Sequence, residues 1–290
     1  MLHSLLMNAD CDVVVHYLHG SNFPTTDAAR LEQMLGASAN RLELHEVPDD
    51  WLKGLPTQNR FGPAMWYRLF LPELLPSVRK LLYLDVDTLI TDQLAPLWKV
   101  DLGDRYLGAV TNVFIEGHAY RHEQLGIDPS HYFNSGVLVL NLNVMRNERF
   151  TEQVIRTIVD MLEVLEWPDQ DALNLVVADR RVRLHPRWNC MNSLLTRRHL
   201  AINVFGAQTV DEAVLRPAIR HFEGPDQNKP WHLLHDRRGQ RLYRVHRSAS
   251  PWPEYGMEGT TWLNRCKRVL ADVRNPSAVL NRPSVTERER

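Results

Sequence analysis

The chain has 290 residues, 44% of them apolar and 24% charged, so it can bury a full core in one large domain or two small ones. The formal net charge of −1 argues against nucleic-acid binding, and the sequence shows neither an apolar run near the ~20 residues of a membrane span nor a signal-peptide pattern. The three cysteines lie far apart, without zinc or disulfide spacing, which indicates free thiols in a reducing cytoplasm.

The predicted elements mix strands with helices. In chain order they are a short N-terminal helix, a strand at 12–18, a helix at 26–35 ended by Gly36, a strand at 41–47, a helical stretch at 63–71 ended by Pro72, and strands at 81–84, 106–110 and 136–142. Then follow an amphipathic helix at 150–165, a helix starting near Pro168, a short strand at 219–222 and a helix at 261–273. This mixture indicates an α/β fold.

The composition changes towards the C-terminus, where arginine, histidine and tryptophan become frequent. We expect a main domain at residues 1–240, a basic and aromatic extension at 241–274, and a polar, disordered tail at 275–290 that has little to bury. The extension has two interpretations. It is either a peripheral contact with an anionic membrane surface or an ordinary solvated helix packed on the domain.

The most informative motif is Asp-Val-Asp at residues 85–87, directly after the apolar run at 81–84. Alternation along an extended backbone predicts that Asp85 and Asp87 point to one side at the carboxyl end of a buried strand, where ligands bind in open α/β sheets. Two adjacent carboxylates suit Mg²⁺ or Mn²⁺, which commonly bind together with phosphates. Other copies of the motif, which follow no strand, are better read as turns or helix caps.

Two polar segments downstream offer candidate sugar ligands. Asn134 lies in a small polar turn ahead of the strand at 136–142, where its amide either orients a hydroxyl-rich ligand or only shapes the turn. Asp169 follows Pro168 at a helix start and is a natural N-cap. Gln170 would lie in the first helical turn, near the positive end of the helix dipole, which suits polar groups that face a sugar.

A third cluster of candidates lies at residues 221–232. His221 would end a short strand and point towards a metal ion, although an isolated histidine is more often a core or surface residue. Gly224 shapes a turn, and Lys229 supplies a point charge for phosphate. Arg68, on the helical stretch that precedes the metal-binding strand, is interpreted as a diphosphate clamp, with a surface salt bridge as the alternative.

Taken in order, these segments resemble the retaining glycosyltransferases of family 8, which have a GT-A fold and include bacterial lipopolysaccharide galactosyl- and glucosyltransferases and glycogenin. The matching parts are Tyr-Arg-Leu at 67–69, Leu-Tyr-Leu-Asp-Val-Asp at 82–87, Pro-Leu-Trp at 96–98, Asp-Leu-Gly-Asp at 101–104, Phe-Asn-Ser-Gly-Val-Leu-Val-Leu-Asn-Leu at 133–142, Asp-Gln-Asp-Ala-Leu-Asn at 169–174, His-Phe-Glu-Gly-Pro at 221–225 and Lys-Pro-Trp-His at 229–232. Each part alone is weak, but the ordered set is specific. It implies a mixed central sheet flanked by helices.

The resemblance also implies roles for the candidate residues. It implies three ligands for Mn²⁺, with Mg²⁺ as the alternative: Asp85, Asp87 and His221. It implies three groups that hold the donor's phosphate oxygens: Arg68, Gly224 and Lys229. It implies three residues that line the transferred sugar and the acceptor: Asn134, Asp169 and Gln170. Of these, Asp169 and Gln170 are the catalytic candidates.

The implied reaction is transfer of galactose or glucose from a UDP-sugar to a glycan or glycolipid acceptor such as lipopolysaccharide core, with retention at the anomeric carbon. The metal would act as a Lewis acid that stabilises the leaving UDP. Gln170 would be a poor covalent nucleophile, so a same-face mechanism, in which the leaving phosphate helps to deprotonate the acceptor, is favoured. The implied location is the cytoplasm, with the inner face of the membrane as a site of peripheral attachment.

The sequence departs from the family pattern in two places. The loop between Gly224 and Lys229 is about two residues longer than usual, which could displace Lys229 from the phosphate. In addition, residues 1–6 resemble the helix that follows the family's first strand, so that strand and much of the nucleotide pocket are expected to be missing. We attribute this to a start set at an internal Met, and expect an unpaired sheet edge as a result.

Two alternatives to an active transferase remain open at this stage. One is a haloacid-dehalogenase-like phosphatase with Asp85 as nucleophile and Asp87 as acid/base. The usual Gly-Thr continuation and a downstream acidic pair are absent from the sequence, which argues against it. The other is a sugar-nucleotide-binding relic without turnover, which the missing first strand favours.

Overall fold

The computed structural model describes residues 1–36, 39–56 and 62–274 of the chain. These divide between His221 and Phe222 into two compact units, and each unit is described by itself. The tail predicted to be disordered, residues 275–290, lies outside the described residues. The division follows contacts within the chain, so the functional domains expected at 1–240 and 241–274 stay a prediction.

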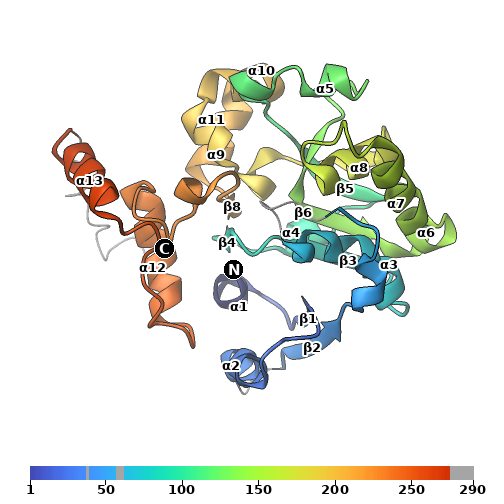
Figure 1. Cartoon of the computed structure of the whole chain (residues 1–290), viewed down its shortest axis with the longest axis horizontal. Coiled ribbons are helices and arrows are strands. Elements are labelled where there is room, and N and C mark those ends of the chain that lie inside the picture. Colours follow the sequence, from blue (N-terminus) through green and yellow to red (C-terminus); the bar gives the residue numbers. More distant parts are fainter. Residues whose placement is uncertain (37–38, 57–61, 275–290) are drawn as a thin grey trace. The chain divides into compact units, whose positions relative to one another are not determined.

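The first unit contains three small sheets (Figure 1). One pairs β1 (Val14–His19) with β2 (Arg41–Glu46) in parallel. The second has the strand order β3-β6-β5-β7, formed by β3 (Lys80–Leu84), β6 (Phe133–Asn141), β5 (Leu107–Thr111) and β7 (Arg181–Arg183). The third pairs β4 (Thr88–Ile90) with β8 (Ile219–His221) in antiparallel fashion. In the described part of the chain β1 has only β2 as a partner; the expected loss of a further strand beside it stays a prediction.

Helices and short 3₁₀ turns connect these strands. The α-helices of the first unit are α1 (Leu2–Asn8), α2 (Thr25–Leu35), α3 (Leu71–Leu74), α4 (Ala95–Trp98), α5 (Arg121–Gln124), α6 (Leu142–Asn147), α7 (Phe150–Met161), α8 (Pro168–Val177), α9 (Asn192–Thr196), α10 (Arg198–Phe205) and α11 (Ala207–Leu215). Its 3₁₀ turns are η1 (Asp49–Leu52), η2 (Pro63–Phe70), η3 (Glu116–His118) and η4 (Pro186–Asn189). The predicted α/β class is therefore confirmed.

Strand β6 lies at the centre of the core. Because side chains alternate along a strand, Leu138 and Leu140 enter one apolar cluster while Val137 and Val139 enter the other. A strand buried on both faces reads in sequence as a continuous apolar run, which is the pattern that predicted it. The strand pairs with β3 on one side and β5 on the other, so it fixes where β3 ends.

Several predicted boundaries change in the structure. Strand β6 begins at Phe133, so Asn134 lies within the strand and not in a turn ahead of it. The helical stretch before β3 is a 3₁₀ turn, η2, and Pro72 does not end it, because this proline occupies the first turn of α3, where its missing N–H costs nothing. Helix α7 ends at Met161, earlier than 165. The helix ended by Gly36 is confirmed, and this glycine has a φ of 63°.

The second unit contains a short 3₁₀ turn and two helices, η5 (Asp226–Asn228), α12 (Arg237–Ser248) and α13 (Trp262–Arg274). Helix α12 begins at a cap in which Asp236 accepts a hydrogen bond from the Gly239 N–H. An ion pair from Arg237 on α12 to Asp272 on α13 joins the two helices, and Arg268 pairs with the same carboxylate from within α13. None of the described helices is long and apolar enough to cross a membrane.

Candidate active site

The end of β3 places two carboxylates at the edge of the sheet. Asp85 N–H still donates to the Gly136 carbonyl at 2.8 Å, but the chain then turns, and Thr88 closes the turn by donating its N–H and its hydroxyl to the Asp85 carbonyl. Asp85 and Asp87 therefore converge through a tight turn, not through alternation along an extended strand as predicted. The turn leaves Val86 75% exposed and both carboxylates partly buried.

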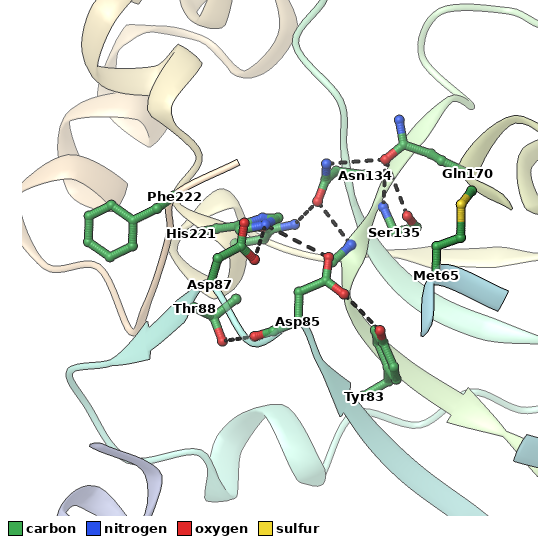
Figure 2. Close-up of polar contacts among 12 residues, drawn as sticks. Met65, Tyr83, Asp85, Asp87, Thr88, Asn134, Ser135, Gln170, His221 and Phe222 are labelled. Atoms are coloured by element: carbon green, nitrogen blue, oxygen red, sulfur yellow. Dashed lines mark hydrogen bonds and ion pairs between the residues drawn. The ribbon is translucent and has the colours of Figure 1, made fainter. Parts of the chain in front are cut away.

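The pairing of β4 with β8 brings a histidine to these carboxylates. Thr88 lies opposite His221 in the antiparallel register. The His221 Nε2 atom lies 3.3 Å from Asp87 Oδ1 and 3.9 Å from Asp85 Oδ2, and all three ligand atoms lie within 4.8 Å of one another. Figure 2 shows the three side chains pointing towards one another. Two carboxylate oxygens and one imidazole nitrogen aimed at one point form a donor set that fits a divalent cation.

A chain of amides orients the histidine ring. The Nδ1 atom of His221 lies 2.9 Å from Asn189 Oδ1, which can only accept, so Nδ1 carries the proton and Nε2 presents its lone pair to the carboxylates. Asn189 in turn donates its amide to Asn134 Oδ1 at 2.8 Å. Outer partners of this kind fix the tautomer and the ring position of a metal-binding histidine. Asn189 was not among the predicted site residues, because nothing near it in the sequence forms a recognisable pattern.

Gly136 makes the close approach of these groups possible. A Cβ atom at this position would lie 2.3 Å from His221 Cε1 and 2.8 Å from Asp85 Oδ2. Both distances are far inside van der Waals contact, so any side chain here would displace the histidine or the carboxylate. In the structure this glycine therefore makes room for the side chains that face the metal position.

Arg68 holds the carboxylates from the other side. Its Nη2 donates to Asp85 Oδ1 at 2.9 Å, its Nε lies 3.4 Å from Asp169 Oδ2, and its Nη1 donates to the Ser135 carbonyl at 2.8 Å. The side chain is only 10% exposed. Its predicted alternative as a surface salt bridge is therefore wrong, because Arg68 lies below the surface and both of its carboxylate partners are partly buried. Its role in binding phosphate stays a prediction.

The electrostatics of this group keep Arg68 charged. Burial alone would lower the pKa of its guanidinium, but the negative charges of Asp85 and Asp169 outweigh burial and raise that pKa above its ordinary value. Burial also raises the pKa of the Asp169 carboxyl, which Arg68 partly offsets. Burial raises the pKa of Tyr83 well above its ordinary value, so this hydroxyl stays protonated and donates to Asp85 at 2.7 Å.

Gln170 lies in the first turn of α8 with its amide held on both sides. Its Oε1 accepts from Asn134 Nδ2 at 3.2 Å and from the Ser135 N–H at 3.0 Å (Figure 2). Its Nε2 donates to the Tyr132 hydroxyl at 3.1 Å. Through Asn134, this amide belongs to the same hydrogen-bonded network as His221. The structure thus brings together the predicted residues of the first unit: Arg68, Asp85, Asp87, Asn134, Asp169, Gln170 and His221.

The predicted N-cap role of Asp169 is wrong. Helix α8 begins at Pro168, so Asp169 lies inside the first turn, where its carboxylate pairs with Arg68. The Asp171 Oδ2 atom accepts the N–H groups of Glu166 and Trp167 at 2.9 and 3.0 Å, which ties the segment before the helix to its first turn. The predicted start of the helix is confirmed, and its N-cap residue, Trp167, makes no capping hydrogen bond through its side chain.

The remaining two predicted residues belong to the second unit. Gly224 has a φ of 98°, a conformation that favours glycine, and Lys229 Nζ donates to the Phe222 carbonyl at 3.0 Å. The longer loop between them forms the 3₁₀ turn η5. Their predicted contact with phosphate stays a prediction.

Tyr83 is a further residue that the sequence analysis overlooked. It lies two positions before Asp85 on β3, and residues two apart on a strand share a face. That spacing was a usable signal for a hydroxyl beside the carboxylate. The Arg68 guanidinium carbon also lies 4.6 Å from the centre of the Tyr83 ring, which adds a cation–π contact.

Replacing Asn189 by alanine is expected to weaken divalent-cation binding by about 10- to 100-fold, because His221 would lose the acceptor that fixes its tautomer. Isothermal titration with Mn²⁺ measures the change, and Asn147→Ala on the exposed end of α6 is the matched control. Equal affinities for the two variants would show that Asn189 does not orient the ring.

Comparison with known proteins places this site in a family. The family model for glycosyl transferase family 8 matches residues 1–234. The chain belongs to glycosyl transferase family 8. The matched range contains every site residue described above, so the phosphatase alternative is excluded and the chain is a glycosyltransferase.

Relatives within family 8 extend over most of the chain. General stress protein A of Bacillus subtilis is 29% identical over 80% of this chain and 81% of its own length. Lipopolysaccharide 1,2-glucosyltransferase of Escherichia coli K12 is 26% identical over 74% of this chain and 62% of its own length, so this chain spans less than two thirds of that enzyme. The crystal structure of galactosyltransferase LgtC in complex with donor and acceptor sugar analogs superposes with a TM-score of 0.71 at 26% identity, covering 89% of this chain and 90% of LgtC. The predicted GT-A fold is thereby confirmed.

Proposed function

We propose that this family 8 glycosyltransferase moves galactose or glucose from a UDP-sugar to a glycan acceptor such as lipopolysaccharide core, with retention at the anomeric carbon and with Mn²⁺ as the cofactor. The observation that carries the proposal is the convergence of Asp85, Asp87 and His221 from two strand ends onto one point. Its relatives include a lipopolysaccharide glucosyltransferase and a galactosyltransferase, which supports the substrate class.

The residues around the metal ligands have separate roles in this proposal. Asp85, Asp87 and His221 would hold Mn²⁺, with Mg²⁺ as the alternative ion. When bound, the cation would neutralise negative charge on the diphosphate as UDP leaves. Arg68 keeps Asp85 in position and adds fixed positive charge beside it. Gly224 and Lys229 would hold phosphate oxygens.

The sugar side of the site would be formed by Asn134, Asp169 and Gln170. The Gln170 carbonyl oxygen already accepts hydrogen bonds from Asn134 and Ser135, which lowers its electron density and makes it a weaker nucleophile than a free amide. Asp169 is committed to Arg68. Neither group suits covalent attack on the anomeric carbon. We therefore propose that the acceptor hydroxyl attacks on the face that UDP leaves, and passes its proton to the leaving phosphate oxygen.

We further propose that residues 1–240 act as the catalytic domain in the cytoplasm and that the following helices touch an anionic membrane surface. Helix α13 carries an exposed apolar stripe, with Trp262 79%, Val269 60% and Val273 72% exposed. Helix α12 is rich in arginine. Apolar and basic groups together favour binding at an anionic lipid surface. Co-sedimentation with vesicles containing anionic lipid tests this, and equal binding to neutral vesicles would contradict it.

The test of the proposed reaction is release of UDP from UDP-galactose and UDP-glucose in the presence of Mn²⁺, Mg²⁺ or a chelator. We expect release from one donor, dependent on the cation, and an increase when a lipopolysaccharide-core acceptor is added. Lys229→Ala is expected to raise the dissociation constant for UDP by about 10-fold, the effect of one lost charge-assisted hydrogen bond. Absence of both turnover and cation-dependent UDP binding would instead identify a relic without activity.

A further inference from the structure

One face of the β1–β2 pair carries three side chains that bind transition metals. In the parallel register His16 lies opposite Glu43, and Leu18 lies opposite His45. Paired residues share a face, and residues two apart on one strand share it too. His16, Glu43 and His45 therefore project from the same face of the pair. They are distinct from the Asp85, Asp87 and His221 cluster, and their strands belong to a different sheet.

The distances between their ligand atoms match the edges of a metal coordination sphere. His16 Nδ1 lies 3.0 Å from His45 Nε2 and 3.1 Å from Glu43 Oε2, and His45 Nε2 lies 3.8 Å from the same carboxylate oxygen. A tetrahedral ion with ligands about 2.05 Å away has ligand–ligand separations of about 3.3 Å. The three measured separations lie on either side of this value. A central ion would need only small side-chain rotations.

Hydrogen bonds alone do not satisfy all three of these ligand atoms at once. If His16 Nδ1 carries a proton, that single proton must serve both the Glu43 oxygen and the His45 nitrogen, which lie at nearly equal distances. If His45 Nε2 donates to His16 instead, the His16 lone pair faces the negative Glu43 oxygen. A cation between the three atoms removes this conflict, because all of them can then point lone pairs at it.

The donor set and its burial select the kind of ion. Two imidazoles with one carboxylate favour Zn²⁺ and similar first-row ions, whereas Mg²⁺ and Ca²⁺ prefer sites built from oxygen. The side chains of His16 and His45 are 9% and 20% exposed, so the surrounding residues restrict their rings. The Glu43 side chain is 47% exposed, so an ion can reach the cluster from solvent on that side. A three-residue set leaves the fourth tetrahedral position for water.

We propose that His16, Glu43 and His45 form a zinc-class metal site that cross-links β1 to β2. Among the described residues no third strand pairs with β1 or β2, and a metal bridge between the two strands would help to hold their register. The bridge would stabilise this part of the fold without taking part in sugar transfer. The proposal does not depend on the identity of the donor sugar or the acceptor.

The experiment is equilibrium dialysis of the untagged full chain against Zn²⁺ after removal of metals by a chelator. The chain used carries Asp87→Ala, so that the cluster of Asp85, Asp87 and His221 contributes little to the Zn²⁺ that is bound. We expect one Zn²⁺ per chain, and an affinity reduced at least about 100-fold by His45→Gln. His199→Gln, an exposed histidine on α10, is the matched control and should leave binding unchanged. Replacing Zn²⁺ by Co²⁺ should give the visible absorption of a tetrahedral site, lost in His45→Gln.

Thermal unfolding gives an independent readout. Zn²⁺ at about 100 times its dissociation constant should raise the Tm of the Asp87→Ala chain by about 5 °C. The increase in Tm should be much smaller when His45→Gln is added to that chain. Should His45→Gln fail to fold, Glu43→Gln decides the question, since it changes a half-exposed carboxylate to an amide of the same shape. Tight Zn²⁺ binding that survives loss of a ligand, or no tight binding in the Asp87→Ala chain, would overturn the proposal.

Discussion

Replacing Asp87 by alanine is expected to lower cation-dependent turnover of the donor sugar by on the order of 10³-fold while leaving the fold intact. The Asp87 carboxylate is the acidic group nearest to His221 Nε2 in the cluster, at 3.3 Å against 3.9 Å for Asp85. Its removal leaves one carboxylate, already shared with Arg68 and Tyr83, to face the cation. The backbone turn does not depend on this side chain, because Thr88 closes it through the Asp85 carbonyl.

Two measurements separate the loss of metal binding from general damage. Titration with UDP in the presence and absence of Mn²⁺ should show that the cation no longer strengthens UDP binding in Asp87→Ala. Asp104→Ala, which removes a carboxylate that is 92% exposed, should keep both cation dependence and turnover. Circular dichroism should be the same for both variants. Unchanged cation-dependent UDP binding in Asp87→Ala would exclude Asp87 as a metal ligand.

Replacing Gly136 by alanine is expected to abolish most cation binding and to lower the free energy of unfolding by about 1–3 kcal/mol, the usual cost of overpacking a buried site. The new methyl group would lie 2.3 Å from the His221 ring and 2.8 Å from the Asp85 carboxylate. Neither neighbour can move freely. Asn189 holds the His221 ring, while Arg68 and Tyr83 hold Asp85.

The matched control for this substitution is Gly117→Ala, since a Cβ atom at Gly117 meets nothing within 4 Å. Denaturant unfolding and Mn²⁺ titration of both variants test the two effects separately. We expect Gly117→Ala to leave both the free energy of unfolding and the affinity for Mn²⁺ unchanged. If Gly136→Ala bound Mn²⁺ as tightly as the unmodified chain, then His221 and Asp85 would not be ligands in their present positions.

Much of the fold was predictable because its signals are local. Continuous apolar runs marked β3 and β6, and Gly36 marked the end of α2. Errors arose where a local signal competes with a distant partner. Asp169 has the local signature of a helix cap, and only the position of Arg68 shows that its carboxylate is engaged in an ion pair.

The candidate site likewise contains residues that the sequence predicted and residues that only the structure identified. The order of motifs along the chain was sufficient to predict Asp85, Asp87 and His221 as one group, since a family resemblance carries three-dimensional information. Local sequence patterns contained no such signal for Asn189, which reaches His221 from a 3₁₀ turn. Nor did they show that Gly136 makes room for side chains rather than for a ligand.

By itself the sequence determined the α/β class, the strand that ends at Asp85 and the chemistry of the residues that follow it, because hydrophobic periodicity and side-chain type are properties of neighbouring positions. Only the tertiary structure decided which distant positions meet. The antiparallel register sets Thr88 opposite His221, and the parallel register sets His16 opposite Glu43. A shift of one residue in either pairing would turn these side chains to the opposite face, and strand register between remote segments is not encoded in either strand alone.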